Sequence, residues 1–192
     1  MSLSRDFYLQ DAVKVAQNLV GKKLIRNVDG EKLVGKIVET EAYMGRSDKA
    51  SHTYKGKSDR TNILFSEGGK VYVYLIYGMH NCLNITVNKE SLPQAVLIRA
   101  LEPIQGKHKM HNFRDKKGPD LTNGPAKLCQ AFNIDRSLYG EDIIKGNKLL
   151  IKNGDPSDKL VSTTRINIDY AEEDKDNPWR FYEANNQYIS QE

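Results

Sequence analysis

The sequence predicts an α+β fold: a single compact domain over residues 1–192, with a mixed, mostly antiparallel β-sheet, flanking helices and a protruding β-hairpin. The strand-like runs follow one another through short turns, and they lack the regular strand–helix alternation of a parallel sheet. Two apolar runs, 71–77 and 82–87, are separated only by residues 78–81, which is typical of a hairpin tip. No repeat, low-complexity linker or domain boundary interrupts the chain.

The bulk composition is that of a soluble globular protein. Hydrophobic residues make up 39% of the chain and charged residues 28%. The net charge of +4 permits an anionic partner without requiring one. The N-terminus has no apolar signal region, and no apolar run is long enough to span a bilayer. We therefore expect a cytoplasmic monomer, nucleoid-associated if bacterial, with no membrane partner.

The cysteines and histidines do not form a metal-binding pattern. Cys82 and Cys129 lie in apolar surroundings, which is typical of buried free thiols. The four histidines are scattered or lie in loops, and no spacing resembles a zinc site. We expect no metal and no cofactor.

The N-terminal third is expected to form a helix and two strands. Residues 11–20 are predicted to be helical, with Asp11 as the N-cap and Gly21 as the stop. A turn at Asp29-Gly30 joins two predicted strands, 22–26 and 33–43. Alternation along the second strand places Glu39 and Glu41 on one side.

The remaining segments continue the same pattern. A long polar loop over 45–69 contains His52, and loops of this length are usually functional or disordered. Two further segments are predicted as a strand over 95–101 and a helix over 123–132 that starts near Pro125. We expect a basic solvated loop over 105–123. After residue 140 the pattern indicates short strands.

Glu41 is the first candidate for chemistry. It lies on a semi-apolar side of its strand, where burial raises the pKa of a carboxyl group and a nearby cation lowers it. A glutamate under both influences can act as a general base toward water. The alternative is a half-exposed glutamate paired with a lysine, and the residues alone leave Glu39 as an equal candidate.

Aromatic residues are the second signal. Tyr72 and Tyr74 share one face of their strand, where they can line either the sheet core or a pocket. Tyr77 adjoins Gly78 at the predicted hairpin tip, where a bulky side chain is well placed to protrude. Side chains that enter and kink a nucleic-acid duplex have this placement.

Two polar residues occupy apolar segments. Asn84 lies between Leu83 and Ile85, so its amide needs partners from the backbone or from a ligand. Arg99 ends a buried-looking strand, which indicates pairing with a carboxylate or a phosphate.

Together, several motifs resemble the alkyladenine (3-methyladenine) DNA glycosylase family. The resemblance runs from about Asp6 to the segment Arg180-Phe181-Tyr182, in matching order and spacing. The motifs are Val38-Glu39-Thr40-Glu41-Ala42-Tyr43, Ser51-His52, Val71-Tyr72-Val73-Tyr74-Leu75-Ile76-Tyr77-Gly78-Met79, Leu83-Asn84-Ile85, Leu97-Ile98-Arg99-Ala100-Leu101-Glu102-Pro103 and Gly124-Pro125-Ala126-Lys127-Leu128-Cys129-Gln130-Ala131.

The resemblance implies a monofunctional base-excision-repair enzyme without a cofactor. Its partner would be double-stranded DNA containing damaged purines. The implied substrates are 3-methyladenine and 7-methylguanine, with ethenoadenine and hypoxanthine as further candidates. The base would be flipped out of the duplex, and its N-glycosidic bond hydrolysed by a glutamate-activated water to leave an abasic site.

The resemblance also implies site roles. Glu41 would be the general base, with Arg99 holding Glu41 and the water. Tyr43 and Tyr74 would sandwich the base, His52 would complete the pocket, and Asn84 would oppose guanine's amino group. The hairpin-tip residues would contact DNA, with Tyr77 filling the gap that the base leaves: Tyr77, Met79 and His80. The stretches 105–123 and 141–176 carry no motif that assigns a role.

Two other functions use the same residues. A non-catalytic module for damaged DNA would explain Tyr77 but leaves Glu41 and Arg99 without a role. A nucleoside hydrolase would use the carboxylate and the rings on a free nucleoside but leaves the protruding Tyr77 unexplained.

Overall fold

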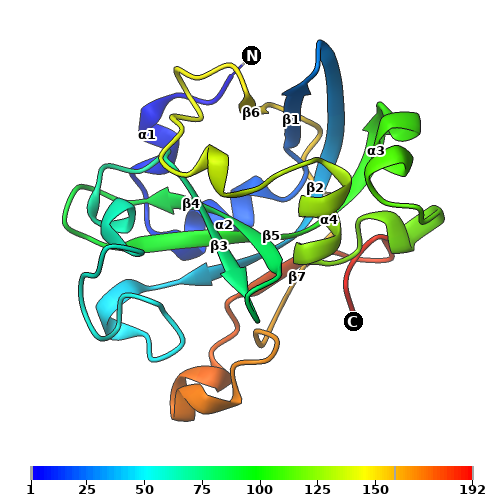
Figure 1. Cartoon of the computed structure of the whole chain (residues 1–192). Coiled ribbons are helices and arrows are strands. Elements are labelled where there is room, and N and C mark those ends of the chain that lie inside the picture. Colours follow the sequence, from blue (N-terminus) through cyan, green and yellow to red (C-terminus); the bar gives the residue numbers. More distant parts are fainter. Residues whose placement is uncertain (1, 158, 192) are drawn as a thin grey trace.

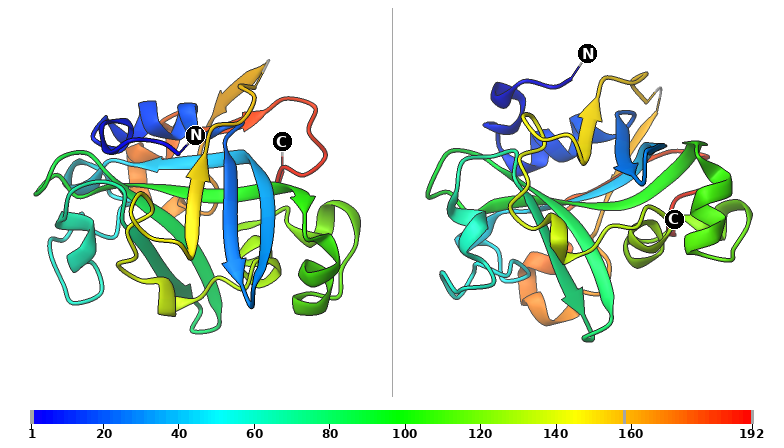
Figure 2. Two further views of the ribbon diagram at one scale, coloured as in Figure 1. Left: turned by 90° about the horizontal axis from the view of Figure 1, so that it is seen from above. Right: turned by 45° about the horizontal axis from the view of Figure 1, so that its top comes forward.

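The computed structural model describes residues 2–157 and 159–191, and an eight-stranded β-sheet forms its centre. The main path has the order β3-β4-β5-β2-β1-β6, while β8 pairs with both β2 and β7. All strand pairs are antiparallel. Figure 2 shows α2 on one side of the sheet and α3 and α4 on the other. The predicted α+β class is confirmed.

The N-terminal helices cover one face of the sheet. Helix α1 spans Arg5–Tyr8 and α2 spans Ala12–Leu19. The predicted cap is confirmed, because the Asp11 side chain accepts a hydrogen bond from the backbone N–H of Val13. Gly21 follows the helix with a φ of 91°, a conformation that favours glycine. On the sheet side, the Thr40 hydroxyl donates to the carbonyl of Ala16 and fixes α2 to β2.

Strand β2 carries both candidate glutamates. Strand β1 spans Lys23–Val28 and β2 spans Glu31–Tyr43, with the predicted turn between them. Next to β5, Ile37 pairs with Leu101, Glu39 with Ala100, and Thr40 with Ile98. Val38 and then Arg99 therefore lack a register partner in this strand pair. This double irregularity lies where the candidate glutamates and Arg99 meet.

The protruding hairpin is confirmed, but its tip is shorter than predicted. Strand β3 spans Val71–Ile76 and β4 spans His80–Val87, so His80 and Asn81 belong to β4 and not to the tip. The N–H of Met79 donates to the carbonyl of Ile76. Tyr77 and Gly78 both have positive φ, 53° and 72°, as a type I′ turn requires. The sequence did not predict the left-handed backbone conformation of Tyr77.

The central strand β5 is longer than predicted and spans Gln94–Gln105. The prediction of a loop over 105–123 is wrong, because α3 spans Lys107–Phe113 and a 3-10 helix follows at Gly118–Leu121. Only Met110 of α3 is buried, so the helix has almost no apolar stripe to reveal it. The predicted helix α4 spans Pro125–Ala131 and begins with Pro125.

The last third forms short strands, as predicted. The strands are β6 at Leu149–Lys152, β7 at Leu160–Thr163 and β8 at Arg180–Glu183. Between β7 and β8 lies the 3-10 segment Asp169–Asp176, which is orange in Figure 1. The other short 3-10 helices are Gly45–Ser47, Asn62–Phe65 and Arg136–Leu138.

One large apolar cluster fills the space between the sheet and its helices. Cys82 and Cys129 are buried and free, as predicted. Across residues 2–157 and 159–191, no helix is both long and apolar enough to cross a membrane. In Figure 1 the hairpin tip, the cyan loop and the orange segment lie toward the same end of the molecule.

Candidate functional site

Two pockets lie at this end of the molecule and share a wall made of Tyr43, His52, Tyr74 and Tyr170. We call the first the inner pocket, whose remaining lining residues are Ala50, Ser51, Leu64, Tyr72, Asn84 and Ala95. We call the second the outer cleft, whose remaining lining residues are Arg60, Leu75, Ile76, Tyr77, Cys82, Leu97, Arg99, Pro125, Ile166, Asn167 and Ile168.

Glu41 is fully buried directly behind the wall of the outer cleft. Its Oε1 accepts the backbone N–H of Ile166 at 2.8 Å and pairs with Arg99 Nη1 at 3.2 Å. Its Oε2 accepts the Tyr43 hydroxyl at 2.9 Å. All three partners line the cleft. Since a carboxylate oxygen can accept two hydrogen bonds, Oε2 can accept one more beyond those made by the described part of the chain.

Glu39 is equally buried, and its carboxylate is bound by two arginines and by Ser190. Its Oε1 accepts from Arg99 Nε at 3.1 Å, Arg180 Nη1 at 3.0 Å and Ser190 Oγ at 2.9 Å. Its Oε2 accepts the backbone N–H of Ser190 at 2.6 Å. Neither glutamate itself lines either pocket, but all three partners of Glu41 line the outer cleft, whereas only Arg99 among the partners of Glu39 does. The structure therefore separates the two candidates on β2: Glu41 adjoins the cleft, whereas Glu39 anchors arginines.

Arg99 joins the two carboxylates. Its side chain is 9% exposed, and the carboxylates of both glutamates lie within 3.2 Å of its guanidinium. Burial alone would lower the pKa of Arg99, but Glu41 and Glu39 outweigh this effect and raise the pKa. The predicted pairing with a carboxylate is confirmed, and the arginine stays charged.

The inner pocket is built from the aromatic face of β3. The rings of Tyr72 and Tyr74 are stacked, with centroids 5.6 Å apart. His52, from the loop after β2, meets the Tyr74 ring edge-on at 4.5 Å, and its Nδ1 lies 2.9 Å from the Tyr72 hydroxyl. Burial, followed by the charge of Arg60, lowers the pKa of His52 to about 4. His52 is therefore neutral near pH 7.

Asn84 faces the inner pocket from β4. It is 4% exposed, and its Nδ2 donates to the carbonyl of Tyr72 at 3.4 Å. The amide is thus held by the neighbouring strand while the side chain lines the pocket. The sequence predicted that the amide would bind either the backbone or a ligand. The structure shows the backbone partner, and it also places the side chain in the pocket wall.

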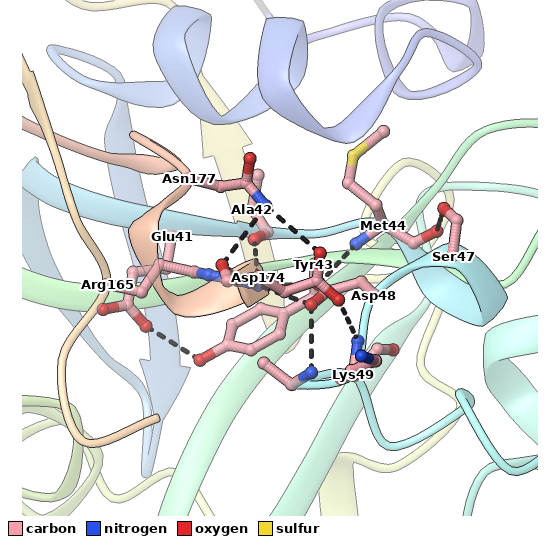
Figure 3. A network of polar contacts seen from close by, with 12 residues as sticks. Glu41, Ala42, Tyr43, Met44, Ser47, Asp48, Lys49, Arg165, Asp174 and Asn177 are labelled. Atoms are coloured by element: carbon pink, nitrogen blue, oxygen red, sulfur yellow. Dashed lines mark hydrogen bonds and ion pairs between the residues drawn. The ribbon is translucent and has the colours of Figure 1, made fainter. Parts of the chain in front are cut away.

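Tyr43 is fixed from behind by a buried ion pair. The Arg165 guanidinium lies 4.9 Å from the ring centroids of both Tyr43 and Trp179. Asp48 binds this arginine with both carboxylate oxygens, at 2.6 and 2.9 Å. Figure 3 shows this network, which joins the backbone around Tyr43 to Asp48, Arg165 and Asp174. Burial, together with the charge of Glu41, raises the pKa of Tyr43 well above its usual value.

The hairpin-tip residues do not all face the same space. Tyr77 is 83% exposed and lines the rim of the outer cleft. Met79, 70% exposed, and the exposed His80 line a different groove, whose opposite wall includes α4. The structure therefore places Tyr77 beside the cleft and Met79 and His80 on the other side of the tip.

The sequence assigned no role to four residues of this site, although it named Tyr72 as a ring that could line a pocket. Tyr72 contacts His52, Ile166 binds Glu41, Arg165 packs on Tyr43, and Tyr170 lines both pockets with 67% of its surface exposed. The shared strand face of Tyr72 and Tyr74 was a signal for the first. The other three come from a segment without periodicity or motif, so no local signal marked them.

The donors near the cleft do not form a metal site. Within residues 2–157 and 159–191, no group of three or more His, Cys, Asp or Glu side chains could hold a metal ion. The charged groups of the site are instead paired carboxylates and arginines. Such a site can polarise water and bind a flat aromatic ligand.

Comparison with known proteins gives full-length matches. The family model described as Methylpurine-DNA glycosylase (MPG) matches residues 6–187. A Natranaerobius thermophilus protein named "Putative 3-methyladenine DNA glycosylase" is 46% identical over 196 residues, covering 99% of each chain. A Clostridium botulinum protein of the same name is 48% identical over 200 residues, also covering 99% of each chain. A Methanocella arvoryzae protein of that name is 45% identical over 190 residues, covering 98% of this chain and 95% of its own.

Proposed function

Because the chain belongs to the methylpurine-DNA glycosylase family, as its motifs predicted, we propose that it excises alkylated purines from duplex DNA. The observation that carries the proposal is the placement of Glu41. Its buried carboxylate lies behind a cleft whose wall consists of its own hydrogen-bonding partners, beside an aromatic pocket. A carboxylate that can accept a proton from water, next to rings that can stack on a base, suits hydrolysis of an N-glycosidic bond.

The target base would leave the duplex and enter the inner pocket between Tyr43 and Tyr74. Extruding a base costs about a few kcal/mol, and stacking on aromatic side chains returns roughly 1–3 kcal/mol per base. Alkylation at N3 or N7 gives the purine a positive charge. A cation over a tyrosine ring gains about 0.5–2 kcal/mol more, which favours damaged over normal purines.

Tyr77 would stabilise the DNA duplex from which the base has been flipped. Its ring stands at the tip of the β3–β4 hairpin, exposed, and beside the cleft that leads to the pocket. A bulky side chain in this place can fill the gap left in the base stack. Tyr77 and Gly78 both have positive φ in the short turn at the tip, which sets the direction in which the ring projects.

The chemical step is a displacement by water. Glu41 takes a proton from water while the oxygen attacks C1′ of the sugar, which has developed oxocarbenium character. The C1′–N bond breaks, its electron pair leaves with the purine, and an abasic site remains. An alkylated purine leaves as a neutral base, whereas hypoxanthine also needs a proton. During the reaction Arg99 holds Glu41 in place by the 3.2 Å contact between its Nη1 and Oε1 of Glu41.

We propose that the enzyme acts as a monomer. Its reaction would be monofunctional, which means that it cleaves the N-glycosidic bond without cutting the DNA strand. Among residues 2–157 and 159–191, no lysine lines the inner pocket or the outer cleft, so these residues offer no lysine amine there for a Schiff-base intermediate. Water is then the nucleophile, and the DNA strand stays intact. Borohydride trapping of a covalent enzyme–DNA adduct would contradict this assignment.

Base release tests the proposal. The wild-type protein is incubated with methylated DNA and, separately, with a duplex that carries one hypoxanthine, and free bases are identified by chromatography. Release of methylated purine supports the proposal. Binding without release would favour a damage-binding module, and release from free inosine but not from duplex DNA would favour a nucleoside hydrolase.

A further inference from the structure

The segment that follows β8 turns back and contacts the arginine of the site. Ser190 Oγ donates to Glu39 at 2.9 Å and accepts from Arg99 Nη2 at 3.2 Å. The backbone N–H of Ser190 donates to Glu39 at 2.6 Å. One residue near the end of the described chain therefore binds both members of the buried Glu39–Arg99 pair.

These contacts fix the direction of the Arg99 guanidinium. Its Nε donates to Glu39 and its Nη2 to Ser190, which leaves Nη1 facing Glu41. A guanidinium is planar, so two nitrogens that are held determine where the third one lies. The position of the group that holds Glu41 thus depends on Ser190, which lies outside both pockets.

Packing and charge hold the segment in place. Ile189 packs in a small apolar cluster with Val38 and Ala100, the neighbours of Glu39 and Arg99 in their strands. Arg180, from β8, donates from Nη1 both to Glu39 and to the carbonyl of Gln191. Removing the donors of Ser190 would leave a buried carboxylate oxygen short of partners, which costs free energy.

We propose that Ser190 is a positioning residue for Arg99 and, through it, for Glu41. This inference rests on the proposed function, because it assigns Ser190 a role in base excision. Loss of the Ser190 hydroxyl frees one end of the guanidinium while the backbone N–H still holds Glu39. The chemical step should therefore slow more than DNA binding weakens.

The test compares three full-length variants. Ser190→Ala removes the hydroxyl, whereas Ser190→Thr keeps one. Asn186→Ala is the matched control. Asn186 begins the same segment and donates to Glu102 and Glu183, away from the Arg99 cluster. Single-turnover release of methylated purine from alkylated DNA, the Kd for an abasic duplex and the urea midpoint are measured for each.

Ser190→Ala should slow excision about 10-fold or more, because small displacements of a positioned group reduce rates strongly. Its Kd should stay within about twofold. Ser190→Thr should recover most of the rate, and Asn186→Ala should keep the wild-type rate despite a lower urea midpoint. If Ser190→Ala does not fold, Ser190→Val, which matches threonine in shape, takes its place.

Equal rates for wild type and Ser190→Ala would overturn the inference, as would a loss that Asn186→Ala reproduces. Wild type and Glu41→Gln are assayed in parallel. If wild type releases no base, the proposed function itself fails. If wild type releases base and Ser190→Ala matches it, only the role of Ser190 fails.

Discussion

Arg165 lies against the face of Tyr43, with its guanidinium carbon 4.9 Å from the ring centroid. The same guanidinium lies equally close to Trp179, and it is bound by both oxygens of the buried Asp48. Burial alone would lower the pKa of Arg165, but Asp48 outweighs this effect and raises it. The ring proposed to stack on the purine is therefore backed by a charged, immobile plane.

Asp48→Asn should destabilise the fold because it leaves Arg165 buried without its carboxylate partner. Breaking such a pair costs about 3–5 kcal/mol. Urea denaturation measures the loss. Asp169→Asn, an exposed aspartate at the start of the same 3-10 segment that Tyr170 occupies, should change stability by less than about 0.5 kcal/mol. Equal effects of the two substitutions would mean that the Asp48–Arg165 pair does not support the site.

Tyr77→Ala should weaken binding to an abasic duplex by roughly 1–3 kcal/mol, the stacking contribution of one ring. Tyr77→Phe is the control, since it keeps the ring and loses only the hydroxyl. Both variants should unfold at the wild-type urea midpoint because Tyr77 is 83% exposed. An unchanged Kd for Tyr77→Ala, measured by fluorescence anisotropy, would remove Tyr77 from the role of wedge.

Asn84→Ser should raise the release of guanine relative to hypoxanthine. The shorter side chain gives room for an exocyclic amino group at the place that the Asn84 amide now occupies in the inner pocket. The two release rates are compared in the same duplex sequence. A ratio equal to that of wild type would show that Asn84 does not exclude guanine.

His52 should make the fold less stable in acid. Its pKa is about 4 in the folded protein, below the usual value of 6.5 that applies to an unfolded chain. Between these two values the unfolded state binds the extra proton, so stability falls as pH decreases, by at most about 1.4 kcal/mol per pH unit. Above pH 7 His52 is neutral in both states, so it no longer makes the stability of the fold depend on pH.

Urea denaturation from pH 7 to pH 4 tests this linkage. His52→Gln lacks the titrating ring, so its stability should fall less over this interval than that of wild type. Parallel curves for the two proteins would mean that His52 does not carry the acid sensitivity.

The sequence predicted those parts of the fold that depend on local patterns. The Asp11 cap, the turn at residues 29 and 30, helix α4 and the shared face of Tyr72 and Tyr74 all follow from spacing within a few residues. Helix α3 was missed because a single buried methionine gives no apolar period.

The site depended on contacts that no local pattern contains. Asp48 and Arg165 are 117 residues apart, and Glu39 and Ser190 are 151 residues apart. Alternation along β2 placed Glu39 and Glu41 on one side and could not rank them. Contacts from distant segments distinguish them: Arg180 and Ser190 bind Glu39, whereas Ile166 binds Glu41 beside the cleft.

We propose that the Glu41 carboxylate activates the attacking water, and single-turnover base release by Glu41→Gln measures this role. The variant keeps the size of the side chain but loses its charge. Glu31→Gln, at the exposed start of the same strand, is the matched control. Glu41→Gln should bind an abasic duplex normally while its excision rate falls by about 10²-fold or more, and Glu31→Gln should match wild type. Excision by Glu41→Gln at the wild-type rate would contradict the assignment of Glu41 as the general base.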